Sequence, residues 1–397
     1  MPPARRLWCR TGIARPTQDP RADSHKGANR RARDPVHRRG GAPESPRAVE
    51  RNSVAPHDQH RSRCVHGHDG GDRAGRSRGV YGGDAMSARL RAIARQTEEA
   101  VAGGSYRGPR GRLVPIAAAV EAARAGTWMF GPGPIGLPAG GPAAPAAGFA
   151  GTSFEVTGES STGAARRLTA AGADGSAQGP RGPVAVLNFA SARNPGGGYL
   201  RGAQAQEEDL CRASALYACL LEVREFYDHH RAHPDPFYSD RVIHSPAVPV
   251  IRDGRGELLD EPYTAGFLTA AAPNAGVVLR TAPERADELP GALAVRAERV
   301  LETAAAQGYR RLVLGAWGCG VFRNDPAQVA GAFRGLLVGG RFQGYFDQVV
   351  FGILDRTPGA VTRTAFERAF SSVAQGHPEA DSPDRVSDLL RAPDPTT

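Results

Sequence analysis

The chain has 397 residues, of which 40% are hydrophobic, so it can bury the core of one large domain or of two smaller ones. It contains no run of about 18 apolar residues, and no apolar stretch follows the N-terminal arginines. These features exclude a membrane-spanning helix and a secretory signal peptide. We therefore expect a soluble protein with a cytoplasmic location and no membrane partner.

The net charge of +9 is confined to one end of the chain. Residues 1–85 hold 18 basic and 9 acidic residues, whereas residues 86–397 hold 32 of each kind. The part of the chain that is expected to fold therefore has no basic excess with which to follow phosphates. This balance argues against a nucleic-acid partner.

The cysteines are odd in number and show no C-x-x-C spacing; they are Cys9, Cys64, Cys211, Cys219 and Cys319. Such a pattern indicates free thiols in a reducing compartment, without a disulfide framework or a structural zinc site. No metal-ligand spacing is present elsewhere, so we expect no metal and no cofactor.

Residues 1–85 combine Arg, His, Gly and Pro without periodic apolar positions, which predicts a disordered basic extension. One interpretation is a tail that touches nucleic acid or a membrane. The other is that Met86 is the native start and the preceding residues do not belong to the native protein. The abrupt change of composition at Met86 favours the second interpretation.

Residues 86–150 predict an accessory region with helices over about 87–102 and 114–125, followed by a Gly/Pro/Ala-rich loop over 131–148. From Thr152 onward, short apolar runs alternate with amphipathic helices. This alternation predicts an α/β sheet covered on both faces, in which ligands bind beyond the carboxyl ends of the strands. The predicted strands are 154–157, 184–189, 241–244, 267–271, 311–316 and 349–354; the predicted helices run through 166–168 and over 206–227, 287–306 and 326–338. The last residues, from about 374, are expected to be frayed.

The first chemical motif follows the strand 184–189. Gly196, Gly197 and Gly198 are followed by Gln206-Glu207-Glu208, which opens a helix. Consecutive glycines can adopt positive φ and expose amide N–H groups, while a helix N-terminus adds positive potential. In a chain with 50 glycines, the triplet alone is more often a turn.

A second glycine loop, residues 315–322, follows the strand 311–316. It precedes a helix whose N-cap is either Asn324 or Asp325, with Pro326 next. A strand, a glycine loop and a helix start together predict a phosphate cradle. Phe322, at the end of this loop, is by itself equally compatible with a core aromatic.

Other polar residues have simpler interpretations. No base accompanies Cys319, so a small residue in a tight loop is favoured over a nucleophile. His244 is expected to be structural. His229 and His230 end a helix, where an imidazolium suits the helix dipole.

The triple glycine followed at this spacing by Gln-Glu-Glu resembles the signature of the poly(ADP-ribose) glycohydrolases of the macrodomain superfamily. Residues 188–199, with Gln204-Ala205-Gln206, are similar to the bacterial-type branch, and the resemblance extends over about 86–373. It implies a macrodomain-like three-layer α/β/α sandwich with a mixed central sheet and an N-terminal helical accessory region. The expected division is 1–85 extension, 86–150 accessory region, 151–373 catalytic domain and 374–397 flexible tail.

The resemblance implies hydrolysis of ribose–ribose O-glycosidic bonds in poly(ADP-ribose), with release of ADP-ribose. In this family, the residue at Glu208 is the general acid and then the base for water, while the residue at Glu207 orients the ribose. Successive helical residues point about 100° apart, so the two cannot act as an ordinary glycosidase pair. The second glycine loop wraps the diphosphate, whose charge is expected to keep Glu208 protonated, and Phe322 closes over the distal ribose. The implied substrate-binding residues are Asn188, Asn194, Gly196, Gly197, Gly198, Gln206, Gly318, Cys319, Gly320, Val321 and Phe322.

Three alternatives stay open at this point. A hydrolase for mono-ADP-ribosyl groups on protein or nucleic acid differs only in the leaving group. A non-catalytic ADP-ribose reader would not need Gln206-Glu207-Glu208, and a nucleic-acid-binding protein depends wholly on residues 1–85. The expected partner is poly(ADP-ribose) or an ADP-ribosylated protein; residues 157–162 are candidates to contact adenine, although Glu159 also suits a helix N-cap.

Overall fold

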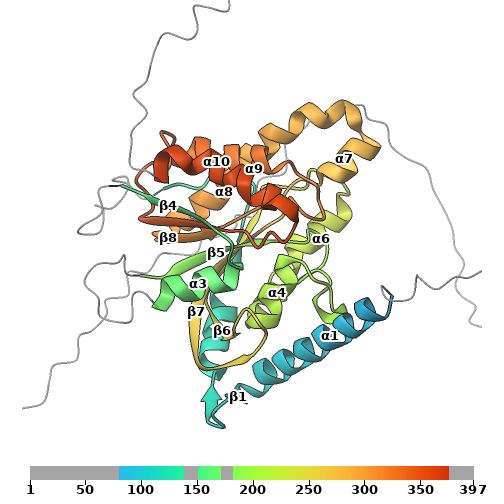
Figure 1. Cartoon of the computed structure of the whole chain (residues 1–397), viewed down its shortest axis with the longest axis vertical. Helices are drawn as coiled ribbons and strands as arrows, with labels where there is room; N and C mark the ends of the chain where they lie inside the picture. The colour runs from blue at the N-terminus through green and yellow to red at the C-terminus, as the bar shows by residue number, and fades with distance from the viewer. Residues whose placement is uncertain (1–79, 138–150, 171–181, 375–397) are drawn as a thin grey trace, which may run out of the picture. The chain divides into compact units, whose positions relative to one another are not determined.

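A seven-stranded mixed sheet forms the centre of the computed structural model, which describes residues 80–137, 151–170 and 182–374 (Figure 1). Across the sheet the strands are β3 (Trp128–Phe130), β6 (Val242–Arg252), β7 (Leu258–Ala270), β5 (Val184–Phe189), β8 (Arg311–Leu314), β9 (Gln348–Gly352) and β4 (Ser153–Thr157). Neighbours from β3 to β7 are antiparallel, whereas those from β7 to β4 are parallel. The carboxyl ends of β4, β5, β7, β8 and β9 therefore lie at one edge.

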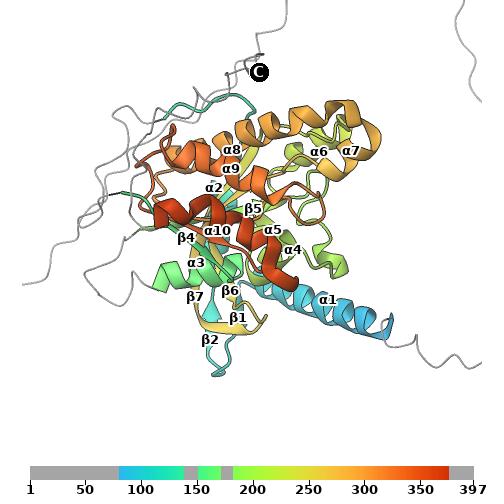
Figure 2. The same cartoon turned by 45° about the horizontal axis from the view of Figure 1, so that its top comes forward.

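Both faces of the sheet are buried, as alternation along β5 shows. Val184 and Val186 belong to one core cluster, and Ala185 and Leu187 belong to the other. The first cluster includes residues of α1 (Val80–Gly103), α2 (Ala117–Gly126), α3 (Ser161–Ala170), α4 (Gln206–Ala213), α5 (Leu216–Leu220) and α6 (Arg224–Ala232). The second includes residues of α8 (Leu289–Ala306), α9 (Pro326–Leu337) and α10 (Val361–Ala374). Figures 1 and 2 show α8, α9 and α10 on the opposite side of the sheet from α3 and α4, which confirms the predicted three layers.

The remaining elements are short. They are the hairpin β1 (Ser105–Arg107) and β2 (Leu113–Pro115), the helix α7 (Ala275–Thr281), and the 3-10 turns η1 (Tyr199–Arg201), η2 (Pro283–Glu288) and η3 (Pro358–Ala360). Of these, β1, β2 and η1 contribute Tyr106, Val114 and Tyr199 to the first cluster.

The single helix predicted over 206–227 is wrong, because the structure divides it into α4, α5 and α6. Ser214 is extended, with φ −146° and ψ 176°, and forms a bridge with Val250 of β6. Ala215 N then donates to Pro249 O at 3.1 Å. Hydrogen bonds to β6 thus replace helical ones at a site without glycine or proline.

The strands β6 and β7 are longer than the predicted 241–244 and 267–271. Pro246 and Pro249 lie within β6, and proline normally argues against a strand. Register shifts between Ser245 and Val248 accommodate this irregularity.

The N-terminal region is joined to the sheet. β3 lies within residues 86–150 and pairs with β6 through the register Trp128–His244. The helix α1 begins at Val80 rather than at the predicted 87. The expectations for residues 1–79, for most of the loop 131–148 and for residues 375–397 lie outside the described residues, as do Cys9 and Cys64.

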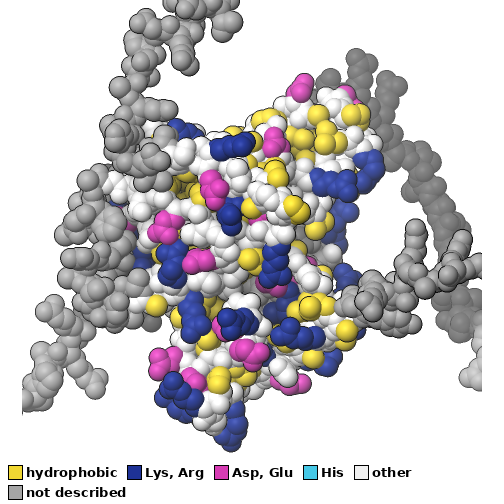
Figure 3. All heavy atoms as spheres, in the orientation of Figure 1, with side chains coloured by type: hydrophobic (Ala, Val, Ile, Leu, Met, Phe, Trp, Pro, Cys, Tyr) yellow, Lys and Arg dark blue, Asp and Glu magenta, His cyan; other side chains and the backbone are white. Residues whose placement is uncertain are grey.

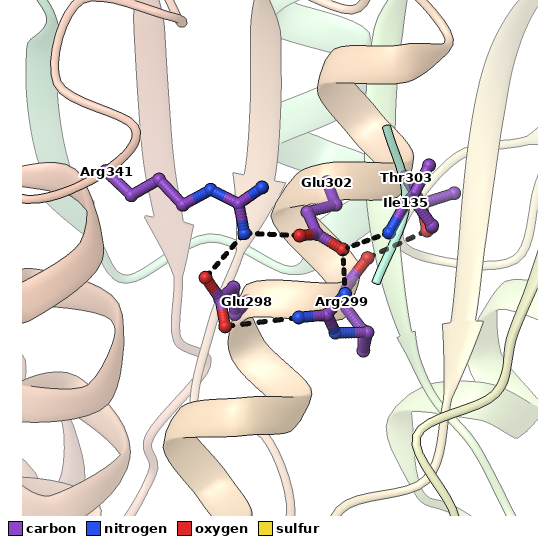
Figure 4. A network of polar contacts seen from close by, with 6 residues as sticks. All are labelled: Ile135, Glu298, Arg299, Glu302, Thr303 and Arg341. Atoms are coloured by element: carbon purple, nitrogen blue, oxygen red, sulfur yellow. Dashed lines mark hydrogen bonds and ion pairs between the residues drawn. The ribbon is translucent and has the colours of Figure 1, made fainter. Parts of the chain in front are cut away.

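A buried charge network fixes α8 to the segment after β3 (Figure 4). The side chain of Glu302 is 0% exposed and accepts bonds from Arg299, Arg341 and the backbone N–H of Ile135, the last at 2.9 Å. Arg341 also pairs with Glu298 at 2.6 Å. A buried carboxylate in such a network is stable only while its partners satisfy it.

We expect Glu302→Ala to lower the free energy of unfolding by about 3–5 kcal/mol, because it removes the buried carboxylate shared by Arg299 and Arg341 and leaves buried Arg299 only its contact with Glu298 at 3.2 Å. Chemical denaturation measures this loss. Glu298→Ala is the control: that side chain is 26% exposed, and its loss should cost about 1 kcal/mol or less. Equal effects of the two substitutions would contradict the central role of Glu302.

Candidate active site

A cleft of about 770 Å³ opens at the carboxyl edge of the parallel strands. Its lining includes Phe189 at the end of β5, Gly320 after β8, residues 160–162 after β4 and residues 352–356 at and after the end of β9. Residues of α1 and α4 line it as well. The cleft lies where ligands bind in open parallel sheets.

Gln206 fastens the start of α4 to the end of β5. Its Oε1 accepts from Phe189 N at 2.9 Å, and its Nε2 donates to Leu187 O at 2.8 Å. The same Nε2 donates to Ser161 Oγ at 3.0 Å. Gln206 therefore satisfies backbone groups of β5 and positions the two residues that follow it. The sequence placed Ser161 among the candidates to contact adenine but did not indicate its bond to Gln206.

Glu207 is buried, with 2% of its surface exposed. Its Oε2 accepts from Ser191 N at 2.7 Å, and its Oε1 accepts from Asn188 Nδ2 at 3.3 Å. Asn188 Nδ2 also donates to Thr269 Oγ1, which faces it across β5 and β7, at 3.1 Å. Asn188 Oδ1 has no partner among the described residues.

Burial raises the pKa of Glu207 from 4.5 to about 8. The hydrogen bond from Ser191 N opposes this increase, and the charge of Glu208 adds to it.

Glu208 reaches the first glycine loop. Its Oε1 accepts from Gly198 N at 2.7 Å, and its Oε2 accepts from Ala205 N at 3.1 Å, which caps the helix. Gly197 has φ +58°, and a Cβ there would lie 2.5 Å from Glu208 Oε1 and 3.1 Å from Glu207 Oε2. Both carboxyl groups therefore meet at Gly197, which has to be glycine.

The side chain of Asn324 fixes the second glycine loop through hydrogen bonds to backbone carbonyl groups. Asn324 Nδ2 donates to Pro273 O at 2.8 Å and to Gly318 O at 3.3 Å. Asp325, not Asn324, is the N-cap of α9, since its side chain accepts from Ala327 N at 2.9 Å. Within the described residues, no acceptor lies opposite the backbone N–H groups of Gly320, Val321 and Phe322.

Of the expected site residues, Gln206, Cys319 and Gly320 line the cleft, whereas the others, including Glu207 and Glu208, are not part of its lining. Val321 is 79% exposed and Asn194 is exposed, and neither lines the cleft. Phe322 packs against Tyr238, with ring centroids 5.8 Å apart. Tyr238 was not singled out in the sequence, yet its φ of +58° marks a constrained position.

The helix α1 forms hydrogen bonds with α4, with Arg252 and with Tyr199. Thr97 Oγ1 donates to Arg212 O in α4 at 2.8 Å, and Arg252 Nε donates to Thr97 Oγ1 at 3.0 Å. Tyr199, next to the glycine triplet, donates to Glu98 Oε1 at 3.0 Å. The sequence showed the apolar face of α1 but not these polar contacts.

Residues at the start of α3 have separate tasks. Ser160, Ser161 and Thr162 line the cleft, and Ser160 Oγ accepts from Gly163 N at 3.1 Å. Glu159 instead pairs with Arg167 at 3.0 Å and is absent from the lining.

The remaining thiol and imidazole groups are structural. Burial raises the pKa of Cys319 to about 12, the opposite of what a nucleophilic thiolate requires. The imidazolium expected at His230 is wrong: its Nε2 accepts from Ser239 N at 3.2 Å, and burial lowers its pKa to about 4. His244 lies buried beside Tyr309, with Nε2 2.9 Å from the hydroxyl.

Two further features are absent from the described ranges. No group of three His, Cys, Asp or Glu side chains there could hold a metal ion. In the same ranges, no helix combines the length and the apolar character that crossing a membrane requires.

The fold and the site together define a class: a macrodomain-like α/β/α sandwich with two glycine loops and a carboxyl pair at the carboxyl edge of its sheet. Residues 94–253 match the family described as microbial-type PARG, catalytic domain. Comparison with curated proteins gave no match.

Several solved structures are similar to this chain in both sequence and fold. The poly(ADP-ribose) glycohydrolase from Thermomonospora curvata is 49% identical, with 71% of this chain and 100% of that chain covered and a TM-score of 0.64. Its complex with the inhibitor ADP-HPD is 47% identical, covers the same shares and has a TM-score of 0.62. The enzyme from Deinococcus radiodurans in complex with ADP-ribose is 42% identical, with 64% and 98% covered and a TM-score of 0.56. This chain belongs to the microbial-type poly(ADP-ribose) glycohydrolase family.

We expect the stability of the wild-type protein to fall, relative to Glu207→Gln, as pH rises from 4.5 to 8. In this window the unfolded chain loses the Glu207 proton while the folded protein keeps it, so unfolding releases a proton. The slope should not exceed about 1.4 kcal/mol per pH unit and should vanish above the folded pKa. Urea denaturation across this range measures it, and exposed Glu225→Gln provides the control. A difference that does not vary with pH would contradict a protonated Glu207.

Proposed function

We propose that the protein hydrolyses the ribose–ribose O-glycosidic bonds of poly(ADP-ribose) and releases ADP-ribose. The observation that carries this proposal is the position of Glu208, a carboxyl group bonded to Gly198 in the first turn of α4, where its neighbours Gln206 and Asp209 line the cleft. Its family relatives are named poly(ADP-ribose) glycohydrolases, and one is described in complex with ADP-ribose.

Glu208 is our candidate for the general acid. The leaving ribose oxygen must be protonated while an oxocarbenium-like centre develops, and one positioned carboxylic acid can supply that proton. The N–H bonds from Gly198 and Ala205 use one lone pair on each carboxyl oxygen and fix the plane of the group. At 7% exposure, Glu208 is also more accessible than Glu207 at 2%. After bond cleavage it can take a proton from the attacking water.

Glu207 is our candidate for orienting the ribose. It is held by Ser191 and Asn188, so its carboxyl group cannot swing toward the scissile oxygen without breaking both bonds. With its raised pKa it can carry a proton at neutral pH and donate it in a hydrogen bond to a sugar hydroxyl.

The second glycine loop is our candidate for the diphosphate cradle. Three consecutive N–H groups, those of Gly320, Val321 and Phe322, have no acceptor among the described residues and are available to donate to an anion. A bound diphosphate there would also stabilise positive charge on the ribose in the transition state.

We place the protein in the cytoplasm. Cys211, Cys219 and Cys319 are free thiols in the structure, as in proteins of reducing compartments.

We expect Glu208→Gln to lower kcat on poly(ADP-ribose) by about 10²–10⁴-fold, because the amide cannot donate and retrieve the proton. Binding of free ADP-ribose, measured by calorimetry, should stay within about threefold, roughly one neutral hydrogen bond. Glu225→Gln, on the exposed face of α6, should keep full turnover. Retention of turnover by Glu208→Gln would remove this residue from the acid role, and absence of turnover in the wild type would refute the proposed activity.

We expect Gly320→Ala to fold normally but to bind ADP-ribose at least about tenfold more weakly. A Cβ at Gly320 meets no atom of the described chain within 4 Å, and the residue lines the cleft, so the added methyl group would compete for space with a diphosphate bound at this loop. Gly331→Ala, in α9 and equally unhindered, is the control. Calorimetry and thermal unfolding on both variants separate binding from stability; unchanged affinity of Gly320→Ala would place the diphosphate elsewhere.

A further inference from the structure

The cleft concentrates positive charge that the folded part of the chain does not have in excess. Residues 86–397 hold equal numbers of basic and acidic residues. The cleft lining, however, includes five arginines and three aspartates: Arg89, Arg212, Arg252, Arg255 and Arg356, with Asp209, Asp253 and Asp355. Figure 3 shows basic side chains gathered over the lower part of this face, where α3 and α1 lie in Figure 1.

Two of the five arginines are committed to the fold. Arg212 pairs with Asp209 and donates to Ala203 O at 2.7 Å. Arg252 is buried and donates to Thr97 Oγ1 and to Gly256 O, the latter at 2.8 Å.

The other three arginines are exposed and form no ion pair with the residues that the structure describes. Arg89 lies on α1, Arg255 on the turn between β6 and β7, and Arg356 on the loop after β9. The one side-chain hydrogen bond recorded among them runs from Arg89 Nη2 to Arg255 O at 3.5 Å. We call these three residues the rim arginines.

The two remaining aspartates do not neutralise the rim arginines. Asp253 Oδ1 accepts the backbone N–H groups of Arg255 and Glu257 at 2.9 and 3.0 Å. Asp355 accepts those of Thr357 and Thr362, both at 2.9 Å. Each carboxylate is thus engaged by its own turn and orders the backbone that carries an arginine.

The three segments that carry the rim arginines, namely α1, the turn between β6 and β7 and the loop after β9, all contribute to the lining of one cleft. The turn between β6 and β7 reaches the start of α3, since a Cβ at Gly254 would lie 3.2 Å from Ser160 Oγ. The Cβ of a residue at position 202, next to the first glycine loop, would lie 2.5 Å from Ser87 O in α1. The rim arginines therefore line the same cleft as Cys319 and Gly320 of the second glycine loop.

We propose that the rim arginines bind the diphosphate of the polymer unit adjacent to the unit held by the two glycine loops. This inference rests on the proposed function and specifies its substrate as a chain of ADP-ribose units rather than a single unit. The N–H groups of Gly320, Val321 and Phe322 are available to donate to the diphosphate of one ADP-ribose unit. A polymer carries a further diphosphate in every additional unit. Guanidinium groups bind phosphate oxygens in a bidentate fork, and their exposure lets them adjust to a flexible chain.

The test compares wild-type protein with the variant Arg89→Ala/Arg255→Ala/Arg356→Ala on poly(ADP-ribose) of defined length. We expect KM for the polymer to rise about tenfold or more at little change in kcat, while the Kd for free ADP-ribose stays constant. The slope of log(kcat/KM) against log[salt] is negative, and its magnitude should decrease by about 2, as for three lost phosphate contacts on a single strand. Replacement of all three by lysine should retain most of the salt dependence but restore KM only in part.

The matched control is Arg280→Ala, an exposed arginine on α7 that is outside the cleft lining and, among the described residues, forms no ion pair. If the triple variant matches this control in KM and salt slope, the inference is overturned. Parallel loss of affinity for free ADP-ribose also overturns it, because the arginines would then belong to the site of the cleaved unit. Thermal unfolding checks the fold, and single variants replace the triple one if it is unstable. A wild-type protein without activity on the polymer would instead refute the proposed function itself.

Discussion

The structure of the site depends on how the first turn of α4 is joined to the end of β5. A parallel strand that ends at a glycine loop leaves backbone groups that need hydrogen-bond partners. Gln206, Glu207 and Glu208 supply them at Phe189, Ser191 and Gly198, respectively. Three successive side chains therefore fix the loop, and in doing so the loop fixes two carboxyl groups.

The N-terminal region is part of this arrangement rather than an appendage to it. Thr97 bonds to the backbone of α4, and Glu98 bonds to Tyr199 beside the glycine triplet. The strand β3 extends the central sheet from the same region. Because buried polar contacts of this kind are strong only when all members are in place, the position of α4 depends on α1.

Basic and acidic side chains are equal in number over residues 86–397, but they are distributed unevenly over the structure. The folded part of the chain is balanced overall, yet the cleft is lined by more arginines than aspartates. In α8, by contrast, arginines are paired with a carboxylate: Glu302 is buried, binds Arg299 and Arg341, and does not line the cleft. The same residue types thus stabilise the packing of α8 and line the cleft at the carboxyl edge of the sheet.

The sequence alone determined the layer order, the strand β5, and the pairing of a glycine triplet with Gln206-Glu207-Glu208, because these depend on local periodicity and spacing. The break at Ser214 and the length of β6 depended on hydrogen bonds between segments distant in sequence, so local pattern predicted both wrongly. For the same reason, only the tertiary structure decided that Thr269 faces Asn188, that Ser161 holds Gln206, and that His230 is neutral. Spacing along the chain shows which groups are available, whereas burial and partners decide their charge and contacts.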